Sequence, residues 1–263
     1  HQQLNQLNIP LWVLRYDLPQ GFQELRQKIS FKSIHSHQET GCLWSYQRDL
    51  RVQTWCRENS IRWHEYQQFA VIRGLKDRRQ WNNQRKKIID RPLVQSPPPQ
   101  ASHRPQLTGL QQVSLKGIEA WNKDLQKGGR SQALQTMKSF FESRGEAYQK
   151  EMSSPVTSVK SCSRLSPYIT WGALSLSEIH HELQKWKKRH RESSKPVKKS
   201  WGQSLRSFES RLWWHCHFIQ KLESEPEIEF QNINRGFDGL RESDFNETFF
   251  QAWCRGETGY PLI

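Results

Sequence analysis

The sequence predicts an α/β region followed by an all-helical region, and three observations carry this prediction. In the first third of the chain, short apolar runs alternate with amphipathic stretches, which is typical of a parallel sheet with crossover helices. Consecutive prolines, Pro97 to Pro99, then exclude both helix and sheet. Beyond them, apolar residues recur at helical spacing. We therefore expect a partial α/β domain (1–94), a linker (95–113) and a helical domain (114–263).

The elements of the α/β region follow from the positions of its apolar residues. Strands are expected at 10–14, 31–34 and 61–66, and helices at 22–29, 45–56 and 71–90. The loop after the second strand contains His35, His37 and Glu39. Ligands bind at the carboxyl ends of the strands in open parallel sheets, so this loop is a candidate site. An ordinary loop explains the same residues.

Apolar spacing and capping residues define the helices of the second region. One helix is expected at 133–148, and another begins after Ser175, with Glu178 completing a capping box. A third helix is expected at 205–222. This region therefore predicts a helical domain with well-marked helix starts.

The helix at 205–222 also carries polar residues where apolar ones are expected. His215 lies within the apolar stripe, and Arg211 borders it, with Trp214 beside them. A polar side chain on an apolar face needs a hydrogen-bond partner or a ligand. Two interpretations remain: His215 faces a ligand, or it is a core histidine that bonds another group of the protein.

Composition points to a polyanionic partner. The net charge is +14 and the sequence pI is about 9.8, which favours DNA or another polyanion. A basic tract near the end of the second helix, which includes Lys187, Lys188, Arg189 and Lys195, fits contact with DNA phosphates, and a solvated loop fits it equally. The 12 Trp and 12 Phe indicate ring-based cores or stacking on planar ligands.

The cysteines and the hydropathy pattern exclude several classes of protein. The five cysteines are scattered and form no CxxC pair, so neither a disulfide framework nor a zinc site is expected, and a reducing, cytoplasmic setting fits. His215, Cys216 and His217 lack a second ligand pair with zinc spacing, so we predict no metal. No apolar run of about 18 residues predicts a membrane span, and no signal peptide is expected.

A polar turn before the capped helix is the strongest candidate binding element. Cys162-Ser163-Arg164-Leu165-Ser166 gathers hydroxyls, an arginine and backbone amides, the groups that bind a phosphate. An ordinary capped helix start is the alternative interpretation of this turn.

The turn and three further blocks resemble the DNA photolyases and cryptochromes. Residues 163–175 are similar to the flavin-clasping segment of that family, Tyr148 stands where the family has a flavin-contacting tyrosine, and 208–223 is similar to the helix that follows. Residues 253–261 resemble the family signature W-x-x-G-x-T-G-Y-P. The four blocks occur in the family's order, and the close resemblance covers about 115–263.

The resemblance implies a Rossmann-like domain joined by a linker to a helical FAD-binding domain, with a possible second antenna chromophore of unknown identity. It implies FAD contacts at Tyr148, Cys162, Ser163, Arg164, Leu165, Ser166, Phe208 and His215. It also implies that Trp214 stacks on the lesion during catalysis. With the charge of the basic tract, we expect DNA contacts at Arg211, Trp214, Lys187, Lys188 and Arg189. A monomeric protein is expected.

Four positions depart from the family pattern. Cys162 replaces a common threonine, Phe208 a tryptophan, Arg211 a glutamate that bonds the pyrimidine dimer, and His215 an arginine. The leading expectation is light-driven repair of pyrimidine photoproducts by electron transfer from reduced flavin. The alternatives are a blue-light photoreceptor without repair activity and a truncated, inactive homologue that binds nucleic acid by charge.

The resemblance also predicts that the sequence is a fragment. It would lack the start of the α/β domain and the C-terminal part of the FAD-binding domain, because the family continues at both ends. We expect such a fragment to bind FAD weakly or not at all by itself.

Overall fold

The computed structural model describes residues 4, 6–75, 77–95, 98–99, 125–193 and 198–260. The chain forms two compact units, one of residues 1–224 and one of residues 225–263, which are described separately. Most of the expected linker, 95–113, lies outside the described residues.

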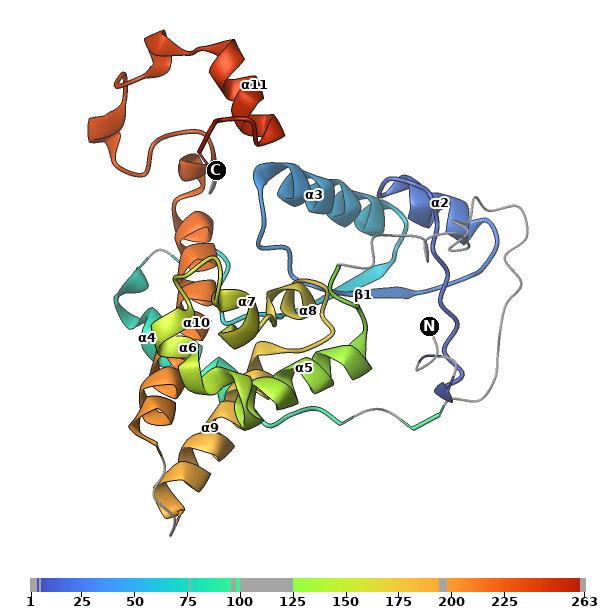
Figure 1. Cartoon of the computed structure of the whole chain (residues 1–263). Helices are drawn as coiled ribbons and strands as arrows, with labels where there is room; N and C mark the ends of the chain where they lie inside the picture. Colours follow the sequence, from blue (N-terminus) through green and yellow to red (C-terminus); the bar gives the residue numbers. More distant parts are fainter. Residues whose placement is uncertain are drawn as a thin grey trace. The chain divides into compact units, whose positions relative to one another are not determined.

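The first unit begins with a small α/β layer. Strands β1 (Ser33–His37) and β2 (Arg62–Tyr66) pair in parallel, with Ile34 opposite Trp63. Helices α2 (Gln20–Arg26) and α3 (Leu43–Glu58) pack on one face of the two strands (Figure 1). This sheet core consists of Val52, Trp55, Cys56 and Ile61, with Leu18, Phe22, Phe31, Ile34 and Trp63 packed against it. The expected parallel crossover is confirmed.

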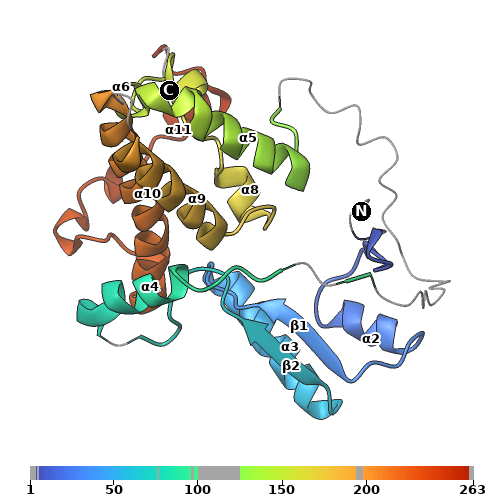
Figure 2. The same ribbon diagram turned by 90° about the horizontal axis from the view of Figure 1, so that it is seen from below.

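The rest of the first unit is helical. Its elements are η1 (Arg78–Gln80), α4 (Trp81–Ile89), α5 (Arg130–Glu142), η3 (Arg144–Ala147), α6 (Tyr148–Glu151), α7 (Ser158–Ser161), α8 (Ser166–Thr170), α9 (Leu176–Glu192) and α10 (Lys199–Ser224). Figure 2 shows α9 and α10 beside α5 and α8. Their helical core is built from large side chains, among them Phe140, Phe141, Tyr148, Leu165, Ile179, Leu183, Phe208 and Cys216.

A buried glutamine joins α10 to the segment before α4. The Gln220 side chain is fully buried, accepts a hydrogen bond from the Ile72 amide at 2.7 Å and donates one to the Ile72 carbonyl at 3.1 Å. Trp81, also buried, donates to the Ala70 carbonyl at 3.0 Å. These bonds satisfy polar groups that would otherwise be costly to bury, so Ala70, Ile72, Trp81 and Ile89 can pack into the helical core.

Several element boundaries differ from the sequence expectation. The segment 10–14 makes only an isolated bridge at Leu14, and β1 begins and ends later than expected, so His35 and His37 belong to the strand. The expected helix 71–90 is interrupted by a turn at Gly74, whose φ is +68°, and only α4 remains. The helix expected at 133–148 ends at Glu142, because the chain turns where Gly145 approaches the Phe140 carbonyl too closely for a side chain.

The second unit contains three short 3-10 turns and one α-helix. The turns are η4 (Pro226–Glu229), η5 (Arg235–Phe237) and η6 (Glu242–Asp244), and the helix is α11 (Glu247–Arg255). The Asn246 side chain caps α11 by accepting from the Phe249 amide at 3.1 Å, and Gly256 ends it in the left-handed conformation. None of the described residues of this unit is buried.

Candidate functional site

The polar turn joins two short helices in the first unit. It runs from α7 to α8, and Arg164 takes the left-handed conformation at φ +57°, which is unusual for a residue with a side chain. Leu165 is 1% exposed and anchors the turn in the helical core, whereas Ser166 is exposed. Among the described residues, the hydroxyls of Ser163 and Ser166 have no hydrogen-bond partner, so both can bind a ligand.

Arg144, which the sequence did not single out, holds this turn in place. Its guanidinium donates to the carbonyls of Cys162 and Ser163, to the Thr136 carbonyl at 3.0 Å and to the Ser139 hydroxyl at 3.0 Å. Burial, with a smaller contribution from Arg164, lowers the pKa of Arg144. No local pattern distinguishes this arginine from the chain's other basic residues, because its partners are backbone carbonyls distant in sequence.

Two of the expected flavin contacts are core residues. Tyr148 is 6% exposed and Phe208 is 3% exposed, and their rings meet edge to face with centroids 5.9 Å apart. Both rings also pack against Phe140. Burial raises the pKa of Tyr148, and a hydrogen bond from Arg211 opposes this only in part. These rings belong to the same buried core as Leu165, the residue that anchors the turn.

Helix α10 places the predicted Trp214 and His215 on different sides. Trp214 is 38% exposed and contacts Trp213 and Phe218, with ring centroids 5.7 and 5.1 Å apart, and Arg211 is exposed. His215 is half-buried against Phe69, and burial, followed by Arg85, lowers its pKa. Consecutive helical residues point about 100° apart, so the two side chains serve different surfaces.

The basic tract is partly used in internal contacts. The Lys187 amine lies 2.7 Å from a carboxylate oxygen of Glu209, and although burial favours the neutral acid, Lys187 and Gln184 lower the pKa of Glu209. Arg189 lies over the Trp186 ring at 5.3 Å. Lys188 makes only a 3.9 Å pair with Glu192 between exposed side chains, and Lys195 lies outside the described residues.

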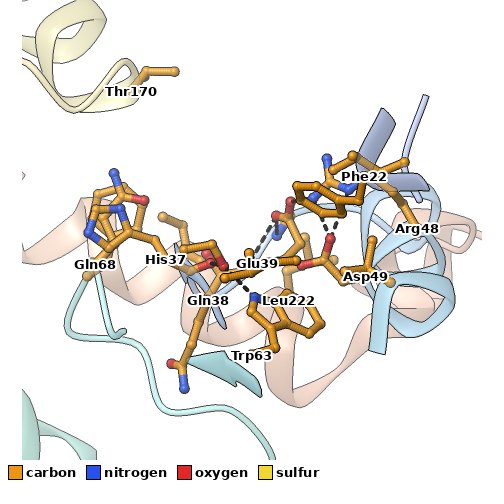
Figure 3. Close-up of a pocket in the computed structure, with 18 of the residues that line it drawn as sticks. Phe22, His37, Gln38, Glu39, Arg48, Asp49, Trp63, Gln68, Thr170 and Leu222 are labelled. Carbon is orange, nitrogen blue, oxygen red and sulfur yellow. Dashed lines mark hydrogen bonds and ion pairs between the residues drawn. The ribbon is translucent and has the colours of Figure 1, made fainter. Parts of the chain in front are cut away.

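A cavity of about 630 Å³ lies at the carboxyl end of β1, where the sequence predicted a ligand-binding loop. It is lined by Leu18, Phe22, Ile34, Ser36, His37, Gln38, Glu39, Thr40, Gly41, Arg48, Asp49, Val52, Trp63, Gln68, Phe69, Thr170, His215, Ile219 and Leu222 (Figure 3). Its lining therefore combines the sheet region with α8 and α10. Apart from the loop and His215, the sequence did not mark these residues, because they come from distant segments.

Charged groups on one wall of the cavity pair with one another. Arg48 lies 3.0 Å from Glu39 and donates to Asp49 at 2.8 Å. Burial alone would lower the pKa of Arg48, but Asp49 and Glu39 raise it. Glu39 also accepts hydrogen bonds from the amides of Thr40 and Gly41 at 2.9 and 2.7 Å. The loop is thus fixed in position by its own acid.

Comparison with known proteins identifies relatives of this chain. Residues 208–263 match the family model described as the FAD binding domain of DNA photolyase. A deoxyribodipyrimidine photo-lyase of Agrobacterium fabrum is 27% identical over 146 residues, which are 54% of this chain and 28% of that protein. The chain is thus similar to the DNA photolyases, both by the family model over residues 208–263 and by relatives that are 27% identical. A (6-4)DNA photolyase of Oryza sativa is 24% identical over 59% of this chain and 27% of its own length.

Solved structures of photolyases and cryptochromes share the fold. A bacterial class III photolyase from Agrobacterium tumefaciens gives a TM-score of 0.71 at 17% identity, covering 99% of this chain and 55% of its own. A cryptochrome of Synechocystis gives 0.74 at 18% identity, covering 99% and 56%. The chain thus spans about half the length of these photolyase and cryptochrome structures.

None of the helices within the described ranges is both long and apolar enough to cross a membrane. No group of three or more His, Cys, Asp or Glu side chains, among those the structure places, could hold a metal ion.

Proposed function

We propose that this chain is part of a FAD-dependent flavoprotein that repairs pyrimidine photoproducts in DNA with light. The observation that carries the proposal is the turn at Cys162–Ser166, with two unbonded hydroxyls, in a chain whose residues 208–263 match a photolyase FAD-binding domain. The similarity to a deoxyribodipyrimidine photo-lyase and to a (6-4)DNA photolyase favours repair. The proposed protein is a cytoplasmic monomer with domains 1–94 and 114–263 joined by the linker 95–113.

The residues of the turn suit the phosphates of FAD. Ser163 and Ser166 offer hydroxyl donors, and exposed Arg164 offers a cation close to Cys162. Leu165 anchors the turn in the helical core, and Tyr148 and Phe208 are buried in that same core. When bound and reduced, FAD supplies the electron after light excitation. The chain's part is to hold the phosphates and exclude water around them.

Trp214 and Arg211 form the proposed DNA surface on α10. Trp214 is exposed enough to stack on an extruded base, and Arg211 beside it can bind a phosphate. Lys188, which among the described residues forms only the long pair with Glu192, can add phosphate contacts. Because Lys187 and Arg189 already contact Glu209 and Trp186, we assign them a smaller part in DNA binding.

The turn is tested by removing its hydroxyls. We expect Ser163→Ala with Ser166→Ala to lower FAD occupancy of the complete protein, since each lost bond to a charged group is worth about 1.5–3 kcal/mol. The measurement is the flavin absorbance per mole of purified protein. The matched control is Ser177→Ala, which changes a serine of α9 outside the turn. Unchanged flavin content in the double variant would overturn the assignment.

Repair is tested by illuminating the complete protein with an oligonucleotide that carries a defined pyrimidine dimer. Restoration of the bases in light, but not in darkness, would support the photolyase assignment. A flavin-loaded protein without repair would support the photoreceptor, which the arginine at 211 favours because it cannot accept a hydrogen bond from the dimer. A protein that binds DNA but no flavin would support the inactive homologue.

We infer that the cavity at the end of β1 takes the second chromophore. Its volume and its Phe22, Trp63 and Phe69 rings suit a planar ligand. A solved relative from Sulfolobus tokodaii, with a TM-score of 0.58 at 18% identity, is described as an archaeal photolyase with two FAD molecules that imply a novel light-harvesting cofactor. We expect Ile219→Trp, which fills the cavity, to remove any second chromophore from the absorption spectrum while flavin remains. Val94→Trp, at a fully exposed position, is the control.

A further inference from the structure

In the part of the chain that the structure describes, one face of the parallel sheet, termed the open face, is exposed. Helices α2 and α3 both pack on the face that carries Ile34 and Trp63. The opposite face carries the alternate side chains of the two strands, all of them exposed, namely Ser33, His35, His37, Arg62, His64 and Tyr66, and His37 at its edge also lines the cavity. Parallel sheets normally have both faces covered, so we expect a ligand or partner to bind this face.

The composition of the open face argues against a covering layer of helices. A helix packed on a sheet buries apolar side chains, and parallel strands that are covered on both faces are apolar throughout. Here the outward positions are polar or carry polar rings, and none of the six is aliphatic. A second copy of the chain is disfavoured as well, because it would bring Arg62 against a like charge.

The rings of the open face form a pre-ordered stack. His35 lies between His64 and Tyr66, with centroid distances of 4.7 and 5.9 Å and interplanar angles of 17° and 12°. His35 also bonds the Tyr66 hydroxyl at 2.9 Å and the Ser33 hydroxyl at 3.2 Å through its two ring nitrogens. The Tyr66 side chain remains 52% exposed at one end of this stack.

The charge around the stack is positive. None of the six outward positions is acidic, and the neighbouring Glu65 points to the other face, where it pairs with Arg73. Arg62 is exposed on the face, and its amide bonds the carbonyl of Lys32, which is also exposed. Exposed stacked rings beside cations are the features by which proteins bind single strands without reading their sequence.

We propose that this open face binds single-stranded nucleic acid. Bases stack on the His64–His35–Tyr66 row, and Arg62 holds a phosphate. This surface is separate from Trp214 on α10 and does not depend on flavin. Through this surface the protein binds an unpaired strand.

The test is the affinity of residues 1–263, and of the complete protein, for fluorescein-labelled oligo(dT), measured by fluorescence anisotropy. We expect Tyr66→Ala with His64→Ala to raise the Kd about 5- to 150-fold, the range for losing one stacked base. Tyr66→Phe keeps the ring and should bind like the wild type. Tyr46→Ala changes an exposed tyrosine of α3 and is the matched control for a surface substitution.

Three outcomes would overturn the proposal. The first is an unchanged Kd for the double variant, with circular dichroism confirming its fold. The second is equal affinity for an abasic strand, which would show that charge alone binds. The third is binding by residues 1–263 but not by the complete protein, which would mean that further chain covers the face. Arg62→Gln gives an independent measurement, and it should reduce the slope of log Kd against log salt by about 0.7.

Discussion

The serine turn and the cavity at the end of β1 are built in opposite ways. The turn uses consecutive residues, leaves two hydroxyls unbonded and depends on one distant side chain, Arg144. The cavity is lined by residues between Leu18 and Leu222, and its charged groups already bond one another. The turn therefore offers unused donors to an anion, whereas the cavity offers shape and rings to a ligand that needs few polar contacts.

The largest effect is expected from a substitution that disrupts the turn and leaves the cavity unchanged. We expect Arg144→Ala to destabilise the protein by about 2–4 kcal/mol, because it leaves the Cys162 and Ser163 carbonyls without their donor. Urea unfolding of the purified chain measures this. Lys160→Ala removes an equal charge from the exposed surface of α7 and should cost less than about 0.5 kcal/mol. Equal stability of the two variants would show that Arg144 does not hold the turn.

A smaller effect is expected from the charged wall of the cavity. Arg48→Ala leaves Glu39 and nearly buried Asp49 without their cation, so we expect a loss of about 1–2 kcal/mol. The control is Arg51→Ala, which removes an exposed arginine of the same helix. If both variants unfold at the same urea concentration, the ion pairs of Arg48 do not stabilise the cavity wall. The charged groups of the cavity would then not be the fixed pairs that their distances indicate.

The smallest effect concerns His215, which belongs to the cavity and not to the turn. Burial lowers its pKa in the folded chain, so the unfolded chain takes up a proton more readily. The stability that it contributes is present above the unfolded pKa, near 6.5, and is lost as pH falls through the folded pKa. We expect His215→Gln to reduce the loss of stability between neutral and mildly acidic pH by less than about 1 kcal/mol.

The measurement is urea unfolding of the wild type and the variant across that pH range. His190→Gln is the matched control, because burial lowers the pKa of His190 as well, but at a site away from the cavity. A wild-type pH profile that His215→Gln leaves unchanged would contradict the burial of this ring.

The sequence predicted the elements whose signals are local. The capping box of Ser175 and Glu178 is confirmed, with hydrogen bonds of 3.1 and 2.9 Å. Helix α3 and strand β2 also lie close to the expected bounds, because their apolar spacing extends over the whole element. The expected strand at 10–14 was wrong, since an apolar run alone does not supply a partner strand.

By itself, the sequence determined the succession of an α/β region and a helical region, the resemblance to the photolyases and cryptochromes, and the turn at Cys162–Ser166. Each of these depends on residue order or spacing, which a chain carries before it folds. Only the tertiary structure decided that Arg144 holds the turn, that Trp214 and His215 serve different surfaces, and that one face of the sheet is open. These properties depend on contacts between distant segments, and such contacts exist only after the cores have packed.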